Sequence, residues 1–99
     1  MFIDSPECFE GLGELKHLDL SGNQLTTLNK EYETFRELRE LDVLDLSNNK
    51  LSWISPNVFS PLMLLTRLNL NGNKMTGEIK LITVTHILVK LIHIQYSDS

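Results

Sequence analysis

Apolar residues recur along the chain in blocks of eleven that share one spacing. In the block from residue 15 to residue 25, leucine and asparagine follow the order LxxLxLxxNxL. The blocks 41–51 and 65–75 repeat this order, with Met75 as the last apolar residue of the third block. The blocks begin 26 and then 24 residues apart. A unit that recurs at such a period predicts a repeat architecture.

A second pattern leads into the blocks and supports this register. Residues 5–15 and 55–65 both read SPxxFxxLxxL, and residues 35–41 show its second half. The chain is therefore expected to open in the middle of a repeat.

The spacing of the blocks predicts parallel strands stacked as a coil. Side chains alternate along a strand, so one set of leucines points inward: Leu18, Leu20, Leu44, Leu46, Leu68 and Leu70. One such strand cannot bury its apolar side alone, whereas strands stacked about 4.8 Å apart share hydrogen bonds and one core. The return segments are expected to close that core from the other side, through Leu25, Leu28, Phe35 and Leu38 and then Leu51, Ile54, Phe59 and Leu62.

Two further features of the repeat carry structural expectations. Asn23, Asn49 and Asn73 fall where the chain leaves each strand. There a short amide can pair turn backbone that would otherwise be buried without a partner, so we expect a structural asparagine ladder. The charged segment 30–40, with Phe35 and Leu38 three residues apart, predicts a short helix on the convex side.

Three copies of LxxLxLxxNxL make the chain resemble the leucine-rich repeat family. The stretch from Phe35 to Ile54 resembles FxxLxxLxxLDLSxNxLxxI, the animal extracellular type of repeat found in Toll-like receptor ectodomains. The stretch from Asn73 to Ile79 is also similar to the plant-type NxLxGxIP, with Lys80 in place of proline. The resemblance implies an α/β fold, a short curved leucine-rich repeat solenoid with a parallel concave sheet.

The period divides the chain into one domain with several units. We expect a partial repeat at 1–14, repeats at 15–40, 41–64 and 65–90, and a degenerate partial repeat at 91–99 that reads LxxIxYSxS. Two alternatives stay open for the tail: a β-prone end that only fills its own space, or residues beyond 80 that are foreign to the repeat. Short repeat arrays normally need polar caps, so end-to-end self-association is expected.

The resemblance places ligands on the concave face. Stacking aligns His17, Val43 and Arg67 in one column, continued by His93, and Asp19, Asp45 and Asn69 in a second, continued by Gln95. Lys16, Asp42 and Thr66 flank them. Aspartate is typical scaffold at these positions, whereas Arg67 and His17 are less typical and are the better candidates.

The sequence argues against an enzyme. No GxSxG, phosphate-loop, HExxH or GxGxxG motif occurs, so no catalytic residue and no cofactor is expected. His17 and His93 would lie about 14 Å apart at strand spacing, too far to share a zinc ion. No metal site is therefore expected.

Charge limits the classes of partner that the chain is expected to bind. The net charge is -4, which argues against nucleic acid and leaves a protein or other macromolecular ligand. The most apolar stretch, 79–96, contains two lysines and two histidines, so no membrane span is expected.

Two functional classes remain. The resemblance implies an extracellular or membrane-associated receptor fragment that signals in innate immunity. The single cysteine and the lack of a signal peptide and of Asn-x-Ser/Thr sequons favour an intracellular adaptor or scaffold.

Overall fold

The computed structural model describes residues 7–29, 33–55, 58–75 and 93–95. Within these ranges the chain forms six short strands, which are β1 (His17–Asp19), β2 (Thr27–Leu28), β3 (Val43–Asp45), β4 (Trp53–Ile54), β5 (Arg67–Asn69) and β6 (His93–Gln95). β1, β3 and β5 each form the centre of an LxxLxLxxNxL block, where side chains alternate between core and surface.

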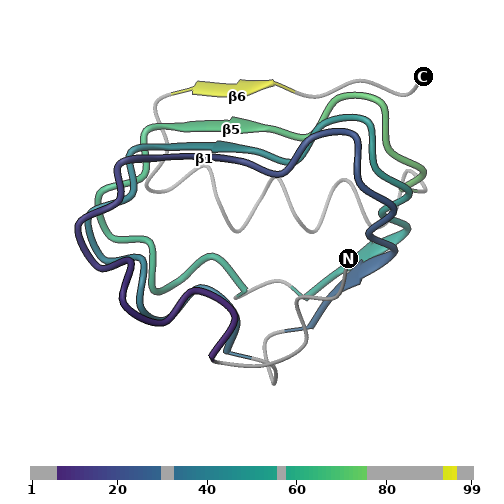
Figure 1. Cartoon of the computed structure of the whole chain (residues 1–99). Helices are drawn as coiled ribbons and strands as arrows, with labels where there is room; N and C mark the ends of the chain where they lie inside the picture. The colour runs from purple at the N-terminus through teal and green to yellow at the C-terminus, as the bar shows by residue number, and fades with distance from the viewer. Residues whose placement is uncertain (1–6, 30–32, 56–57, 76–92, 96–99) are drawn as a thin grey trace.

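The strands form two parallel sheets on different sides of a coil. One sheet has the order β1-β3-β5-β6, and the other pairs β2 with β4. Figure 1 shows the successive coils lying over one another, with the larger sheet along one side and the smaller sheet on another. Backbone bonds such as Leu20 N–H to Asp45 O, at 2.8 Å, and Leu46 N–H to Asn69 O, also at 2.8 Å, join one coil to the next. The predicted leucine-rich repeat solenoid is confirmed.

The leucines that the pattern directs inward form the core. Leu44, Leu46 and Leu68 are at most 1% exposed. Leu18, Leu44 and Leu68 are in register across β1, β3 and β5. Burial of one leucine side chain stabilises a fold by roughly 1.5–3 kcal/mol. Because the coils contribute leucines to the same columns, one core runs from Phe9 to Met75 through the described residues.

Phenylalanine forms a second column on the return side. The ring centroids of Phe9 and Phe35 lie 6.2 Å apart, and those of Phe35 and Phe59 lie 5.8 Å apart. Both pairs are stacked, and all three rings are buried. Stacked aromatic pairs contribute about 0.5–1.5 kcal/mol beyond the area they bury.

The helix expected across the charged segment 30–40 is absent from the part that the structure describes, residues 33–40, which is a succession of turns. Phe35, Leu38 and Leu41 are all buried, and the backbone bonds Leu38 N–H to Phe35 O (3.1 Å) and Leu41 N–H to Leu38 O (3.3 Å) each span three residues. An α-helix turns every 3.6 residues and would rotate these three side chains off one face. A strict period of three suits successive turns, each closed by a hydrogen bond that spans three residues.

The strand expected near the end of the chain is present as β6. It pairs parallel with β5 and places His93 beside Arg67 and Gln95 beside Asn69. Residues 76–92 and 96–99 lie outside the described part of the chain. Most of the plant-type stretch 73–79 and most of the residues beyond 80, which could be foreign to the repeat, therefore lie outside it as well.

Over the ranges that the structure describes, no helix is long and apolar enough to cross a membrane.

Candidate functional site

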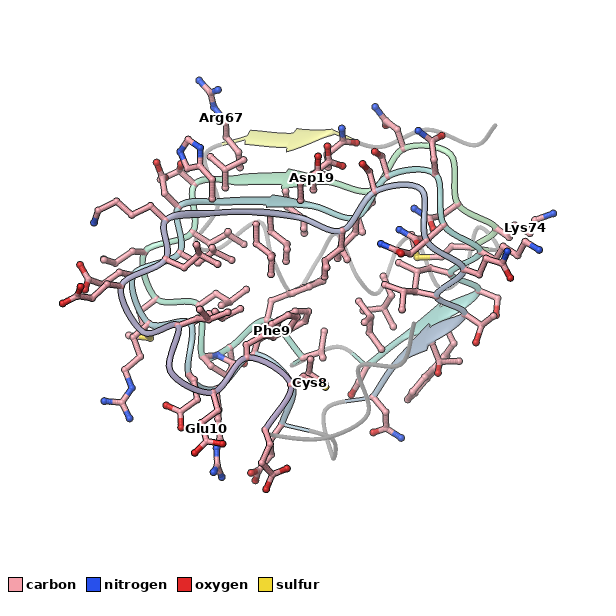
Figure 2. All side chains as sticks on the ribbon, in the orientation of Figure 1. Cys8, Phe9, Glu10, Asp19, Arg67 and Lys74 are labelled. Atoms are coloured by element: carbon pink, nitrogen blue, oxygen red, sulfur yellow. The ribbon has the colours of Figure 1, made fainter. Side chains whose placement is uncertain are left out.

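The outer sheet face is the side of the four-stranded sheet that points away from the leucine core. The column predicted there from the repeat spacing is found in register, with His17 beside Val43 and Val43 beside Arg67. His17 and Arg67 are exposed, and Val43 is partly buried between them. Figure 2 shows Arg67 projecting outward from the sheet, clear of the core.

The second predicted column has a different local role. Asp19, Asp45 and Asn69 are also in register. In each, one side-chain oxygen accepts the backbone N–H two residues further on, at 2.9 Å from Ser21, 2.9 Å from Ser47 and 3.0 Å from Asn71. These are Asx turns, which use a side chain to satisfy the backbone at the end of the strand.

The first aspartate of that column carries an additional hydrogen bond. Ser21 donates its hydroxyl to Asp19 Oδ1 at 2.6 Å, next to the bond from its own backbone N–H. The hydroxyl bond, followed by the backbone bond, lowers the pKa of Asp19 below its usual value because both favour the ionised carboxylate. Asp19 therefore stays charged at any physiological pH.

The two columns therefore differ in how many of their side-chain donors and acceptors are already bonded within the chain. Among the residues that the structure describes, neither His17 nor Arg67 has a side-chain hydrogen bond or ion pair within the chain. Asp19, Asp45 and Asn69 each have an oxygen that is already used by the backbone. The outer sheet face consequently offers the column of His17, Val43 and Arg67 to a ligand more fully than the aspartate column.

The flanking column, which consists of Lys16, Asp42 and Thr66, forms hydrogen bonds and an ion pair within the chain. Lys16 Nζ lies 3.3 Å from Glu40 Oε1, with both side chains largely in solvent. Asp42 accepts a hydrogen bond from the Thr66 hydroxyl, and its backbone oxygen accepts the Thr66 N–H at 2.9 Å. These contacts tie neighbouring coils together at the rim of the outer sheet face.

The asparagine ladder lies where the chain leaves the strands, and it connects coils. Asn49 Nδ2 donates to Leu20 O and Leu46 O at 3.0 Å each, and its Oδ1 accepts from Leu25 N–H at 3.2 Å. Asn73 repeats the arrangement one coil later, to Leu46 O, Leu70 O and Leu51 N–H. Asn23 donates to Leu20 O of its own coil at 2.9 Å.

One exposed apolar feature was not predicted. Met63 and Leu64 are 76% and 55% exposed, just before the strand that carries Arg67. Gly13-Glu14 and Arg39-Glu40 occupy the same place in the two earlier repeats. A comparison of equivalent positions would have found this pair, because the preceding repeats have small or charged residues there.

The described residues include no group of three or more histidine, cysteine, aspartate or glutamate side chains placed to hold a metal ion. The outer sheet face carries exposed side chains on a four-stranded parallel sheet, an arrangement suited to contact with another molecule.

Comparison with known proteins matches two profiles described as leucine-rich repeats, one over residues 31–75 and one over residues 14–35. Among solved structures, the chain is similar to one described as the crystal structure of the TLR13–ssRNA13 complex. TLR13 is a Toll-like receptor. The identity is 31%, the TM-score is 0.77, and the match covers 90% of this chain and 12% of the other. No curated protein matches the chain by sequence.

Proposed function

Because the chain belongs to the leucine-rich repeat family, we propose that it is a protein-binding segment of a receptor ectodomain and that it contacts its ligand through the outer sheet face. The observation that carries the proposal is the register of His17, Val43 and Arg67 in one outward column. Two of these side chains are exposed, and the sheet beneath fixes their spacing.

The chemistry of this surface suits a protein ligand. Arg67 supplies a planar cation with several donors, Val43 an apolar contact, and the exposed pair Met63 and Leu64 further apolar area near the same strand. Arginine and methionine are enriched in protein interfaces, and an apolar centre beside polar groups is their usual composition. Recognition, not catalysis, is what such a surface provides.

Nucleic acid is the competing ligand class, since the similar structure is named as a complex of TLR13 with ssRNA13. Charge argues against it here. The chain has a net charge of -4, and Asp19, Asp42 and Asp45 lie on or beside the outer sheet face. RNA binding depends on clustered lysine and arginine that neutralise phosphates.

The similarity to a Toll-like receptor supports the receptor class over an intracellular adaptor, and with it an extracellular or endosomal membrane setting and a role in signalling. The chain matches 12% of the length of that receptor chain, so membrane attachment and signalling would belong to a larger protein.

The test compares two charge reversals in one coil. Arg67→Glu changes the outer sheet face, and Lys74→Glu makes the same change at an exposed position on a different side of the coil (Figure 2). A partner captured by the wild-type chain is titrated against both variants. We expect Arg67→Glu to weaken binding by roughly tenfold or more, as loss of one well-placed interface arginine does, and Lys74→Glu to leave it unchanged.

Equal effects of the two reversals, or loss of binding with Lys74→Glu alone, would place the ligand elsewhere. A single-stranded RNA oligonucleotide serves as the second probe at physiological salt. We expect no measurable binding to it, and tight binding that Arg67→Glu removes would make nucleic acid the ligand of this face.

A further inference from the structure

An apolar pair interrupts the charged rim of the outer sheet face. Met63 is 76% exposed and Leu64 is 55% exposed. Arg39 occupies the position of Met63 one repeat earlier, and its N–H donates to Glu37 O at 3.0 Å. Met63 N–H donates to Pro61 O at 2.9 Å in the same kind of turn. Exposed apolar residues bordered by polar ones mark interaction sites on soluble proteins.

Two arginines border this pair. Arg39 lies one coil before Met63, and equivalent positions of successive coils in a parallel stack are about 5 Å apart. Arg67 begins β5 three residues after Leu64, so the two lie within about 10 Å along the chain. Both arginine side chains are exposed. We call Arg39, Met63, Leu64 and Arg67 the rim patch, in which two cations border an apolar centre.

Neither arginine is neutralised by the part of the chain that the structure describes. The carboxylates nearest to Arg39 in the sequence already pair with other cations, Glu37 with Arg36 Nε at 3.9 Å and Glu40 with Lys16 Nζ at 3.3 Å. Beside Arg67, the carboxylate of Asp42 accepts the Thr66 hydroxyl. Neither arginine side chain has a hydrogen bond or ion pair with another described residue. Both guanidinium groups are therefore available to a partner.

Resting on the proposed function, we propose that the partner of the rim patch is an acidic protein segment with an apolar side chain between its carboxylates. The carboxylates pair with Arg39 and Arg67, and the apolar side chain packs on Met63 and Leu64. A guanidinium donates two parallel N–H bonds to one carboxylate, in a fixed geometry. One coil spacing and four residues of chain separate the two arginines, together no more than about 20 Å. An extended segment of about six residues spans a similar length.

A uniformly anionic polymer fits this surface less well. It would pair with the arginines and leave Met63 and Leu64 in water, whereas an acidic segment with an apolar centre uses both parts of the rim patch. The carboxylates of Asp42 and Asp45, at and just before the end of the neighbouring strand β3, also repel negative charge that extends over the sheet. The charges of the chain thus favour a short acidic segment at the rim.

NMR titration of the isotopically labelled full chain with a blocked hexapeptide tests the proposal. The peptide has two leucines between two pairs of glutamates. We expect saturable shift changes at the rim patch. Replacing the peptide leucines with serine, or the glutamates with lysine, should raise the dissociation constant by roughly fivefold or more. No saturable binding of the leucine–glutamate peptide overturns the proposal. A serine peptide that binds as tightly as the leucine peptide would make the patch a general anion site and overturns it too.

Variants of the chain locate the contact. Arg39→Glu should raise the dissociation constant of the leucine–glutamate peptide by roughly threefold or more. Lys74→Glu makes the same charge change at an exposed position on a different side of the coil (Figure 2) and should leave it unchanged. The double variant Met63→Ser with Leu64→Ser should bind the leucine and serine peptides alike, because the apolar contact is then gone on the protein side. A preference for leucine that persists in this variant contradicts the proposal.

The proposed function and this partner chemistry fail in different ways. Peptide binding that Arg67→Glu weakens and Arg39→Glu leaves unchanged keeps the outer sheet face as the ligand site and overturns the acidic segment at the rim. Peptide binding that Arg39→Glu weakens and Arg67→Glu leaves unchanged supports an acidic, apolar segment at Met63 and Leu64. That second result overturns the outer sheet face as the site of binding.

Discussion

Asn49 donates from Nδ2 to the backbone oxygen of Leu20 at 3.0 Å, although the two residues are 29 positions apart in the chain. The same side chain accepts from Leu25 N–H at 3.2 Å and is 4% exposed. One amide thus satisfies backbone groups of two coils at a place that water hardly reaches. In addition to the paired strands, the asparagine ladder joins neighbouring coils where the chain turns away from the sheet.

Replacing this asparagine should cost more than replacing its counterpart at the first coil. Asn49→Ala leaves the buried Leu25 N–H without its acceptor, at about 1–3 kcal/mol. It also removes one of two side-chain donors from Leu20 O and from Leu46 O, which Asn23 and Asn73 still bond. We expect the free energy of unfolding to fall by about 2–3 kcal/mol in urea denaturation. Asn23→Ala removes one bond within its own coil and should cost about 1 kcal/mol. Equal losses for the two variants would mean that the bonds between coils contribute nothing extra.

The middle ring of the phenylalanine column should be a major determinant of stability. Phe35 is 1% exposed and stacks on Phe9 and Phe59. Phe35→Ala should lower the free energy of unfolding by about 3–5 kcal/mol, through lost burial and the cavity left behind. Met63→Ala, at a side chain 76% exposed, should change it by no more than about 0.5 kcal/mol. A loss of under 1 kcal/mol for Phe35→Ala would show that the column is not packed as described.

The turns after β1, β3 and β5 each have a left-handed residue, and these three residues should respond differently to substitution. The φ angles are +69° at Gly22, +55° at Asn48 and +72° at Gly72. Alanine at Gly22 meets no atom within 4 Å, so Gly22→Ala should cost only the backbone strain of about 1–2 kcal/mol. A Cβ at Gly72 would collide with the side-chain oxygen of Asn48. Gly72→Ala should therefore lower the free energy of unfolding by more than Gly22→Ala does.

The double variant Gly72→Ala with Asn48→Gly separates the two effects. It removes the side-chain part of the collision, and glycine also relieves the left-handed strain at position 48, so its loss should be smaller than that of Gly72→Ala alone. No recovery in the double variant would show that Asn48 does not contact this turn.

Acid titration should reveal the bonds to Asp19. Its pKa is lowered first by the Ser21 hydroxyl and then by the Ser21 backbone N–H. Because the folded-state pKa lies below the unfolded value, the associated stabilisation is complete above the unfolded pKa and is lost as pH falls through the folded pKa. NMR titration of the Asp19 carboxyl should give a pKa below the usual aspartate range, and Ser21→Ala should raise it part of the way back. An unchanged pKa in Ser21→Ala would contradict the hydroxyl bond.

Much of the fold could be predicted from the sequence because the same pattern of leucine and asparagine occurs in three copies. The alternation around Leu18, Leu44 and Leu68 determines which side chains enter the core. The order of leucine and asparagine that the blocks share determines the register that β1, β3 and β5 adopt. The helix expected over 30–40 was wrong in its described part, since Phe35 and Leu38 fit both a helix and a period of three. Including Leu41 in the pattern favours turns.

The candidate site was harder to predict, because residue type alone does not say what a side chain is bonded to. Asp19 and Asp45 were expected among the ligand contacts with Arg67. Their bonds to Ser21 and Ser47 depend on the backbone conformation after the strand, which spacing does not reveal. A ligand role for any of these residues remains a prediction, and Arg67, like His17, has no competing side-chain bond among the described residues.

The repeats stack as one parallel coil, and the side chains of Asn49 and Asn73 join its neighbouring turns. NMR of the isotopically labelled chain tests it directly, through cross-strand contacts between Leu18, Leu44 and Leu68 and hydrogen exchange of the asparagine side chains. We expect contacts in parallel register between neighbouring strands, and the Nδ2 protons of Asn49 and Asn73 to exchange much more slowly than those of exposed Asn48. Antiparallel or absent cross-strand contacts, with Asn49 and Asn73 exchanging as fast as Asn48, would contradict the stacked coil.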